Sequence, residues 1–273
     1  MAERVVARRR IVRVGPGGRR ATVDTLAGEE PMEVRVDGTA VSVTMRTPGN
    51  DFELALGFCL TEGIVDRPGD VAAIRYCGDD RPAGTYNIVD VRRRVPSPPD
   101  ERLRRNVYTT SSCGVCGTTS IDAVRTHVAD VGDDQLRVAV DVLATLPDRL
   151  RHRQRLFDRT GGLHAAALAL PDGEVRCVRE DVGRHNAVDK VLGWAATEGH
   201  LPLAGHVLVV SGRVAFEIVQ KAATAGVPVI AAVSAPTSLA VDLAESVGMT
   251  LVGFIRDGGM NVYSRADRVV PGA

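Results

Sequence analysis

Two cysteines in the segment YTTSSCGVCG (108–117) are the residues best suited to chemistry in this sequence. Cys113 and Cys116 stand three positions apart among glycine and hydroxyl side chains, a spacing used by metal sites, redox disulfides and sulfur carriers. A structural zinc site needs four ligands, and the sequence offers no second cysteine or histidine pair at ligand spacing. No structural metal is therefore expected.

The setting of the cysteine pair favours a nucleophile over the other uses. A thioredoxin-type pair lies where a strand turns into a helix, and no strand–helix–strand unit precedes this one. Inert surface thiols are disfavoured because exposed cysteines oxidise. A loop of glycine and hydroxyl residues suits a thiol that must reach two partner proteins in turn. Its lack of apolar anchorage predicts that residues 108–118 are mobile.

Polar loops follow three apolar runs in the C-terminal half. The runs predict buried strands at 207–211, 227–234 and 249–255. Between them, helical periodicity predicts helices at 214–225 and 237–247, which end at Gly226 and Gly248. Strands alternating with helices of this length imply right-handed crossovers and a largely parallel sheet. Ligands bind at the carboxyl ends of such strands. The sequence therefore predicts a pocket shared by the loops SGRV (211–214), SAPTS (234–238) and RDGGMN (256–261).

The N-terminal half has a different pattern. Alternating apolar and polar residues around Asp37-Gly38 predict a hairpin over 32–46. A helix is predicted over 51–65, with Asn50 as its cap and Cys59 in the core. Further strands are predicted near 71–76 and 85–91, followed by a proline-rich, charged linker at 92–106.

Composition limits the function classes. The chain has 273 residues, 44% of them hydrophobic, which is enough for a sizeable core, and no apolar stretch long enough to span a membrane. Aromatic residues are 4% of the chain, too few for base-stacking platforms, so no nucleic-acid partner is expected. The arginine clusters at 8–10 and 92–94 are interpreted as solvated surface. Five cysteines, an odd count, fit a reducing compartment, so the cytoplasm is expected and a membrane is not.

Five motifs along the chain form a distinctive series. They are CGVC (113–116), REDVGRHNAVDKVLG (179–193), SGRVAFEIVQKA (211–222), SAPTSLAVDLA (234–244) and GFIRDGGMNVYS (253–264). Their order along the chain is far more specific than the cysteine pair alone. With these motifs the chain resembles the FdhD family of formate dehydrogenase accessory sulfurtransferases over nearly its whole length after residue 30.

The resemblance implies a sulfur relay. A cysteine desulfurase would supply sulfur, and the chain would pass it to the molybdenum bis(molybdopterin guanine dinucleotide) cofactor, a sulfuration that formate dehydrogenase needs. A thiolate attacking a donor persulfide fits this role, and we assign it to Cys113, with Cys116 holding, relaying or releasing the sulfur. The cofactor is cargo here, and a guanine nucleotide would mimic part of it. The resemblance also implies a homodimer.

The resemblance assigns cofactor contacts to the segment FIRDGG. The segment follows a predicted strand and offers a guanidinium for a pyrophosphate, a carboxylate for a guanine edge and N–H groups at a glycine pair. The start of the predicted helix RHNAVDK (184–190) is a less specific anion site, which leaves Arg184 and His185 outside the assignment. The assigned residues are Phe254, Ile255, Arg256, Asp257, Gly258 and Gly259.

The expected fold is α/β, or α+β overall, with two domains. The resemblance implies a three-layer, cytidine-deaminase-like C-terminal domain with a mostly parallel sheet over 135–273. A smaller N-terminal α+β domain with its linker covers 1–108, and the cysteine loop with a connector covers 109–134. Deamination is not expected, because Ala166 stands where a His-x-Glu motif starting at His164 would place its glutamate, and Ser112 replaces proline before Cys113.

A second function class stays open from the sequence. The chain would then be a chaperone that binds the cofactor for formate dehydrogenase without transferring sulfur, and the cysteines would only organise a loop. Which desulfurase and which formate dehydrogenase act with the chain, and whether other molybdoenzymes are served, does not follow from the residues.

Overall fold

The computed structural model describes residues 2–77, 86–96 and 128–272. Cys113, Cys116 and the predicted mobility of residues 108–118 lie outside the described residues. So does residue 108, the predicted end of the N-terminal domain, and the domain bounds stay a prediction.

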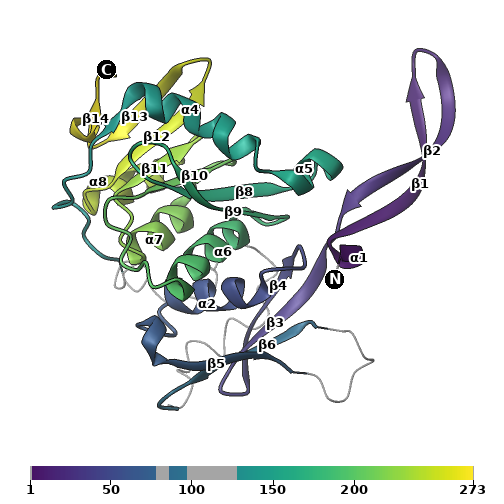
Figure 1. The fold of residues 1–273 in the computed structure, drawn as a ribbon, viewed down its shortest axis with the longest axis horizontal. Helices are drawn as coiled ribbons and strands as arrows, with labels where there is room; N and C mark the ends of the chain where they lie inside the picture. The colour runs from purple at the N-terminus through teal and green to yellow at the C-terminus, as the bar shows by residue number, and fades with distance from the viewer. Residues whose placement is uncertain (1, 78–85, 97–127, 273) are drawn as a thin grey trace.

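A six-stranded sheet organises the C-terminal part, in the order β13–β12–β11–β10–β8–β9 (Figure 1). The predicted strands at 207–211, 227–234 and 249–255 are confirmed as β10, β11 and β12, with bounds shifted by one or two residues. The bounds are β8 (His164–Ala169), β9 (Val175–Asp181), β10 (Val207–Val210), β11 (Val229–Ala232), β12 (Thr250–Arg256) and β13 (Gly259–Ser264).

The prediction of a mostly parallel sheet is wrong for this part. Only the pairings of β10 with β11 and of β11 with β12 are parallel, while β8 with β10, β8 with β9 and β12 with β13 are antiparallel. β8 reads HAAALA, and alanine has a low preference for strands, so its local pattern did not mark a strand. Packing in the core outweighs this low preference and stabilises the strand, because every residue of β8 after His164 is buried.

Helices cover both faces of this sheet and make three layers (Figure 1). One face packs on Leu143, Leu146 and Leu150 of α4. The other packs on α6, α7 and α8, so both faces of the central strands are dry and their sequences are continuously apolar. The predicted helices at 214–225 and 237–247 are confirmed. The bounds are α4 (Val140–Arg151), α6 (Arg184–Thr197), α7 (Phe216–Thr224) and α8 (Ser238–Ser246).

A four-stranded sheet in the order β4–β3–β6–β5 forms the N-terminal part with helix α2. The predicted hairpin is confirmed: Asp37 and Gly38 both have positive φ (50° and 83°), as a type I′ turn requires. Cys59 is fully buried in α2, as predicted. The bounds are β3 (Glu30–Val36), β4 (Thr39–Arg46), α2 (Asp51–Thr61), the 3-10 turn η1 (Pro68–Asp70), β5 (Val71–Tyr76) and β6 (Ile88–Arg93).

Three details of the N-terminal prediction are corrected. Helix α2 ends at Thr61, four residues earlier than predicted, because the chain turns at Gly63, where φ is 67°. Asn50 is the N-cap residue, but its backbone is left-handed and its side chain makes no capping bond. The predicted linker starts too early, since Arg92 and Arg93 belong to β6 and Arg93 pairs with Asp37 at 2.8 Å.

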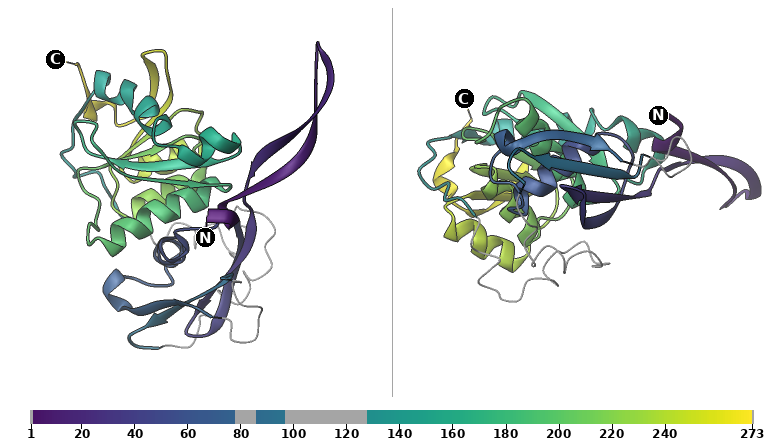
Figure 2. Two further views of the ribbon diagram at one scale, coloured as in Figure 1. Left: turned by 45° about the vertical axis from the view of Figure 1, so that its right-hand side comes forward. Right: turned by 90° about the horizontal axis from the view of Figure 1, so that it is seen from below.

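Helices α2 and α6 join the two parts at very close range (Figure 2). A Cβ atom added at Gly57 of α2 would lie 1.9 Å from the Asp189 carbonyl oxygen, and one added at Gly193 of α6 would lie 1.8 Å from that of Glu53. Only glycine permits this approach, so each helix presents one glycine to the other's backbone. The layers therefore run α4, six-stranded sheet, α6 to α8, α2, four-stranded sheet.

An N-terminal hairpin, not predicted above, projects from the body of the molecule (Figures 1 and 2). Its strands pair over their whole length around Pro16-Gly17, and Arg8, Arg9 and Arg10 are exposed, as expected for solvated surface. The hairpin strands are β1 (Val6–Gly15) and β2 (Gly18–Ala27). The remaining elements are short: α1 (Ala2–Val5), β7 (Val138–Ala139), α5 (Arg155–Thr160), the 3-10 turn η4 (Ala266–Arg268) and β14 (Val269–Val270).

Candidate functional site

The loops after β10, β11 and β12 meet at one edge of the six-stranded sheet, as the sequence predicts. Val214 N–H donates to the Ala235 carbonyl (3.1 Å), and Thr237 N–H donates back to the Val214 carbonyl (2.9 Å). Phe254 N–H donates to the Ser234 carbonyl (3.2 Å) and so attaches the end of β12 to the same group. The loops therefore lie together at the carboxyl ends of the parallel strands, while the predicted pocket between them stays a prediction.

Residues Phe254 to Gly259 form the end of β12 and the turn into β13. Phe254 has φ of 52°, a left-handed conformation that is unusual for a bulky residue, and the register of β12 against β13 shifts between Gly253 and Arg256. Asp257 and Gly258 also have positive φ (51° and 75°), which makes a type I′ hairpin turn. Arg256 and Gly259 pair across it. The irregular backbone carries this segment beyond the regular sheet.

Side chains in this turn differ in their availability to a ligand. Ile255 is buried against the α4 face of the sheet, so its side chain is not available to a ligand. Arg256 is exposed, lies 5.7 Å from the centre of the Phe254 ring, and makes no hydrogen bond or ion pair with the described residues. Asp257 and both glycines are exposed as well. The turn thus presents an exposed guanidinium, an exposed carboxylate and exposed backbone, and its assignment to the cofactor stays a prediction.

A second group of polar side chains lies at the same edge, around the start of α6. His164 begins β8 opposite Asp181, the last residue of β9. Its Nδ1 lies 3.1 Å from the position that a Cβ atom would take on Gly212. Burial lowers the pKa of His164, and the nearby cations Arg184, His185 and Arg213 lower it further. The sequence indicated the helix start but gave no sign that His164 and the 211–214 loop accompany it.

Most of the motif REDVGRHNAVDKVLG holds the two parts of the chain together. Asp181 accepts bonds from Thr47 N–H (3.0 Å) and Asn186 Nδ2 (3.0 Å), and Lys190 Nζ lies 2.7 Å from it. Asp189 accepts a bond from Thr61 Oγ1 (2.9 Å). These side chains are buried at the junction with the N-terminal part. Among the charged residues at the start of α6, Arg184 and His185 are directed elsewhere.

Lys221 of α7 belongs to the same junction. Its Nζ lies 2.8 Å from Thr61 Oγ1, 2.9 Å from Glu62 Oε1 and 3.0 Å from Asp189 Oδ1. Burial alone would lower the pKa of Lys221, but the carboxylates of Asp189 and Glu62 outweigh it and raise the pKa. Lys221 is therefore a structural cation and has no free proton-accepting form at neutral pH.

The position that would carry a deaminase glutamate is closed. Ala166 is fully buried in the core between β8 and the helices α6 and α7. Ala166 offers no acid–base group at this position. Within the described part of the chain, no group of three or more His, Cys, Asp or Glu side chains is placed to hold a metal ion.

Two of the three described cysteines are poor nucleophiles. Cys59 and Cys177 are buried, and burial raises the pKa of both thiols, that of Cys177 to about 12. At neutral pH both are therefore protonated, whereas the thiolate is the form that attacks sulfur. Cys77 is partly exposed. All three are free thiols.

Alkylation of the native protein is expected to spare these two thiols. Iodoacetamide near neutral pH should leave Cys59 and Cys177 unlabelled in the folded protein and label both after unfolding in guanidinium chloride, because protonated and buried thiols do not react. Peptide mass mapping measures this, with Cys77 as the internal control. Equal labelling rates at Cys59 and Cys77 in the folded protein would contradict the burial argument.

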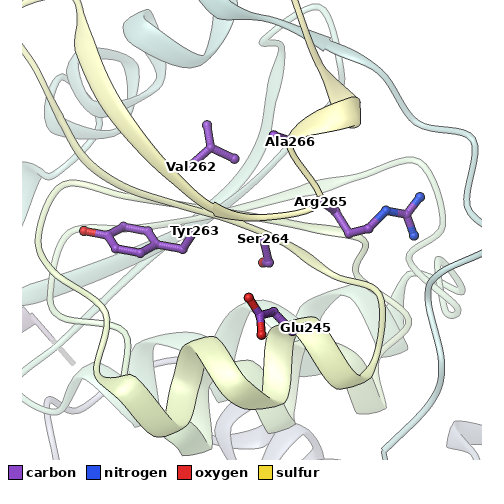
Figure 3. Close-up of a pocket in the computed structure, with 6 residues that line it drawn as sticks. All are labelled: Glu245, Val262, Tyr263, Ser264, Arg265 and Ala266. Carbon is purple, nitrogen blue, oxygen red and sulfur yellow. The ribbon is translucent and has the colours of Figure 1, made fainter.

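Two surface pockets lie away from this edge. One, of about 280 Å³, lies between α8 and the second half of β13 (Figure 3). Glu245 and Ser264 line it, and Ser264 pairs with Leu251 near the amino end of β12. The other, of about 310 Å³, lies beside the edge strand β9 and is lined by Arg153, Arg155 and other basic residues. In the described ranges, no helix has the length and apolar content to cross a membrane.

Comparison with known proteins decides the family. The model of the FdhD/NarQ family matches residues 27–270. The chain belongs to the FdhD/NarQ family. A Streptomyces coelicolor relative named sulfur carrier protein FdhD is 56% identical, over 97% of this chain and 96% of its own length. A Mycobacterium tuberculosis protein of the same name is 55% identical, over 90% and 92%.

A solved structure shares the fold of this FdhD/NarQ chain. The crystal structure of a candidate formate dehydrogenase accessory protein from Desulfotalea psychrophila superposes with a TM-score of 0.79. It covers 97% of this chain and 100% of its own, at 23% sequence identity. The mixed α/β architecture described above is therefore that of an FdhD/NarQ protein, and the family resemblance seen in the five motifs is confirmed.

Proposed function

We propose that the chain is a sulfur carrier in formate dehydrogenase maturation, and that it carries sulfur as a persulfide on Cys113. The observation that supports this most is 56% identity, over 97% of the chain, to a relative named sulfur carrier protein FdhD. The burial of Cys59 and Cys177 adds to it, because it removes two of the five cysteines as carriers.

The first step of the proposed relay is a thiol exchange. The Cys113 thiolate attacks the terminal sulfur of a cysteine desulfurase persulfide, the S–S bond of the donor breaks, and the donor cysteine leaves as a thiolate. The product is a persulfide on Cys113. The sulfur is then passed to the molybdenum bis(molybdopterin guanine dinucleotide) cofactor, which is the cargo and is not a resident group. A cysteine desulfurase and formate dehydrogenase are the proposed partners.

We propose the surface at the carboxyl ends of β10, β11 and β12 as the place where the cofactor binds. Three features of the 254–259 turn favour this: an exposed guanidinium on Arg256 and an exposed carboxylate on Asp257, neither paired with a described residue, and open backbone at Gly258 and Gly259. A homodimer, a cytoplasmic location and a cytidine-deaminase-like fold of the C-terminal layers complete the proposal. Free thiols at the described cysteines favour a reducing compartment.

One experiment separates a sulfur carrier from a chaperone that only binds the cofactor. The protein is incubated with cysteine and a cysteine desulfurase and its mass is measured. A carrier gains about 32 Da for each sulfur bound as a persulfide, and this gain is removed by a thiol reductant. An unchanged mass under conditions in which the desulfurase is active would contradict the proposal and favour the chaperone.

Arg256 tests the cofactor part of the proposal. Replacing it with alanine should weaken guanine-nucleotide binding by roughly 1–3 kcal/mol, the value for a lost charge-assisted hydrogen bond. Persulfide loading should be unchanged. Isothermal titration calorimetry with a guanine nucleotide measures the first and mass spectrometry the second, with Arg265→Ala as a control. Arg265 is outside the turn and pairs with Asp267. Equal affinity of the Arg256→Ala protein and the wild type would move the nucleotide away from this turn.

A further inference from the structure

Helix α6 begins without a cap. Gly183 is the N-cap residue and has no side chain to offer, and the N–H groups of Arg184, His185 and Asn186 have no hydrogen-bond partner in the part of the chain that the structure describes. Three unpaired N–H groups and the positive end of the helix dipole favour an anion at this point. A helix start alone does not make a binding site, so the case for an anion site depends on the side chains around it.

His185 supplies an independent sign of a ligand. The residue is only 8% exposed, yet its Nε2 makes no hydrogen bond with any described group. The carboxylate oxygen Glu217 Oε2 lies 3.7 Å from it, beyond hydrogen-bond length. The Nε of Arg184 next to it is also buried and unpartnered. Buried polar atoms without partners are rare in folded proteins, and a ligand that is bound during function is one of the usual reasons.

The neighbouring groups leave space and add positive charge. Gly212 lies between the ring of His164 and Arg184: a Cβ atom on it would lie 3.1 Å from His164 Nδ1 and 4.0 Å from Arg184 Cβ. Glycine keeps this gap open, and the next residue, Arg213, adds a further cation. Glu217 faces this group: its contact with His185 and the charge of Arg184 hold the pKa of its carboxyl below its usual range despite burial. Arg184 and His185 thus stand beside one carboxylate, that of Glu217, while Asp181, which lies opposite His164, is paired with Lys190.

We propose that Arg184, His185 and the uncapped start of α6, with His164 and Arg213 beside them, bind a phosphate or pyrophosphate group. The chemistry is shared by a free inorganic anion and by the phosphates of a nucleotide. The site lies on the same sheet edge as the 254–259 turn, but on the opposite side of β10 and β11 from it. Only the identity of the natural ligand rests on the proposed function; the anion site itself does not depend on sulfur transfer.

Titration of the full chain with inorganic pyrophosphate tests the site. The wild type should bind, and Arg184→Ala should bind at least about tenfold more weakly, since one charge-assisted contact is lost. Glu217→Gln, which removes the opposing negative charge, should bind more tightly than the wild type. His185→Phe keeps the ring and removes Nε2, and should also weaken binding. Arg20→Ala is the control, because Arg20 is an exposed residue of β2 in the projecting hairpin, outside this group.

Because one variant is expected to gain pyrophosphate affinity and the others to lose it, a folding defect cannot produce the expected result. A variant that merely unfolds loses affinity, whereas Glu217→Gln must gain it. No pyrophosphate binding by the wild type, or equal affinity in the wild type, Arg184→Ala and Glu217→Gln proteins, would overturn the proposal. Displacement of pyrophosphate by a guanosine diphosphate would assign the site to nucleotide phosphates, and displacement by inorganic phosphate alone would assign it to a free anion. Persulfide loading, measured separately, reports on the proposed function and not on this site.

Discussion

Replacing Cys113 with alanine should abolish persulfide loading and leave formate dehydrogenase inactive in cells that depend on this chain. The carrier must attack the donor's sulfur and later release it, and only a cysteine with thiolate character does both. In the sequence, Cys113 follows the hydroxyl residues Thr109-Thr-Ser-Ser112 and precedes Gly114, and we expect these small neighbours to let a partner's persulfide approach. Mass spectrometry of the purified variant and formate oxidation by cell extracts measure the two effects.

Cys116→Ala is the matched comparison for this prediction. It removes the neighbouring thiol and should retain at least part of the sulfur loading, because Cys116 is assigned to holding, relaying or releasing sulfur and not to the first attack. Cys59→Ala serves as a second control, since Cys59 is fully buried in α2. Sulfur loading on the Cys113→Ala protein together with active formate dehydrogenase would refute both the carrier assignment and the relay.

Local sequence patterns predicted the central elements of the fold well. β10, β11 and β12 read as unbroken apolar runs, and α7 and α8 have clear helical periodicity with glycine after their ends. The same reasoning missed β8, whose alanines carry no strand preference, and with it the antiparallel half of the sheet. It also missed the β1–β2 hairpin, although Pro16-Gly17 between alternating residues is a two-residue turn signal that could have indicated it.

The candidate site was predictable only in part, because a motif does not show which of its residues are buried. The segment REDVGRHNAVDKVLG reads as functional throughout, yet Asn186, Asp189 and Gly193 lie on one face of α6 and contact the N-terminal part. Their spacing of three and four residues is a signal of a packed helix face. By contrast, the proximity of His164 and Gly212 to Arg184 depends on the pairing of β8 with β9 and β10, which no local pattern determines.

The buried pair formed by Lys190 and Asp181 should contribute strongly to the stability of the whole molecule. Both side chains are almost completely buried, and Lys190 Nζ lies 2.7 Å from Asp181 Oδ2 and 2.9 Å from the Thr47 carbonyl. Replacing Lys190 with methionine keeps an unbranched apolar chain as far as Cε but leaves the Asp181 carboxylate buried without its cation. The free energy of unfolding should then fall by about 3–5 kcal/mol, as measured by guanidinium chloride unfolding followed by circular dichroism.

Two further variants distinguish the unpaired charge from simple loss of packing. Arg176→Met breaks an exposed pair with Glu174 at 3.3 Å and should change the free energy of unfolding by no more than about 0.5 kcal/mol. Adding Asp181→Asn to Lys190→Met removes the buried negative charge and should recover part of the loss, because the amide oxygen still accepts from Thr47 N–H. A free energy of unfolding of the Lys190→Met protein equal to that of the wild type would show that water reaches Asp181.

The same charge pair also fixes the start of α6, because Asp181 accepts a bond from Gly183 N–H (2.8 Å). The Lys190→Met protein, where it stays folded, should therefore also bind pyrophosphate more weakly than the wild type.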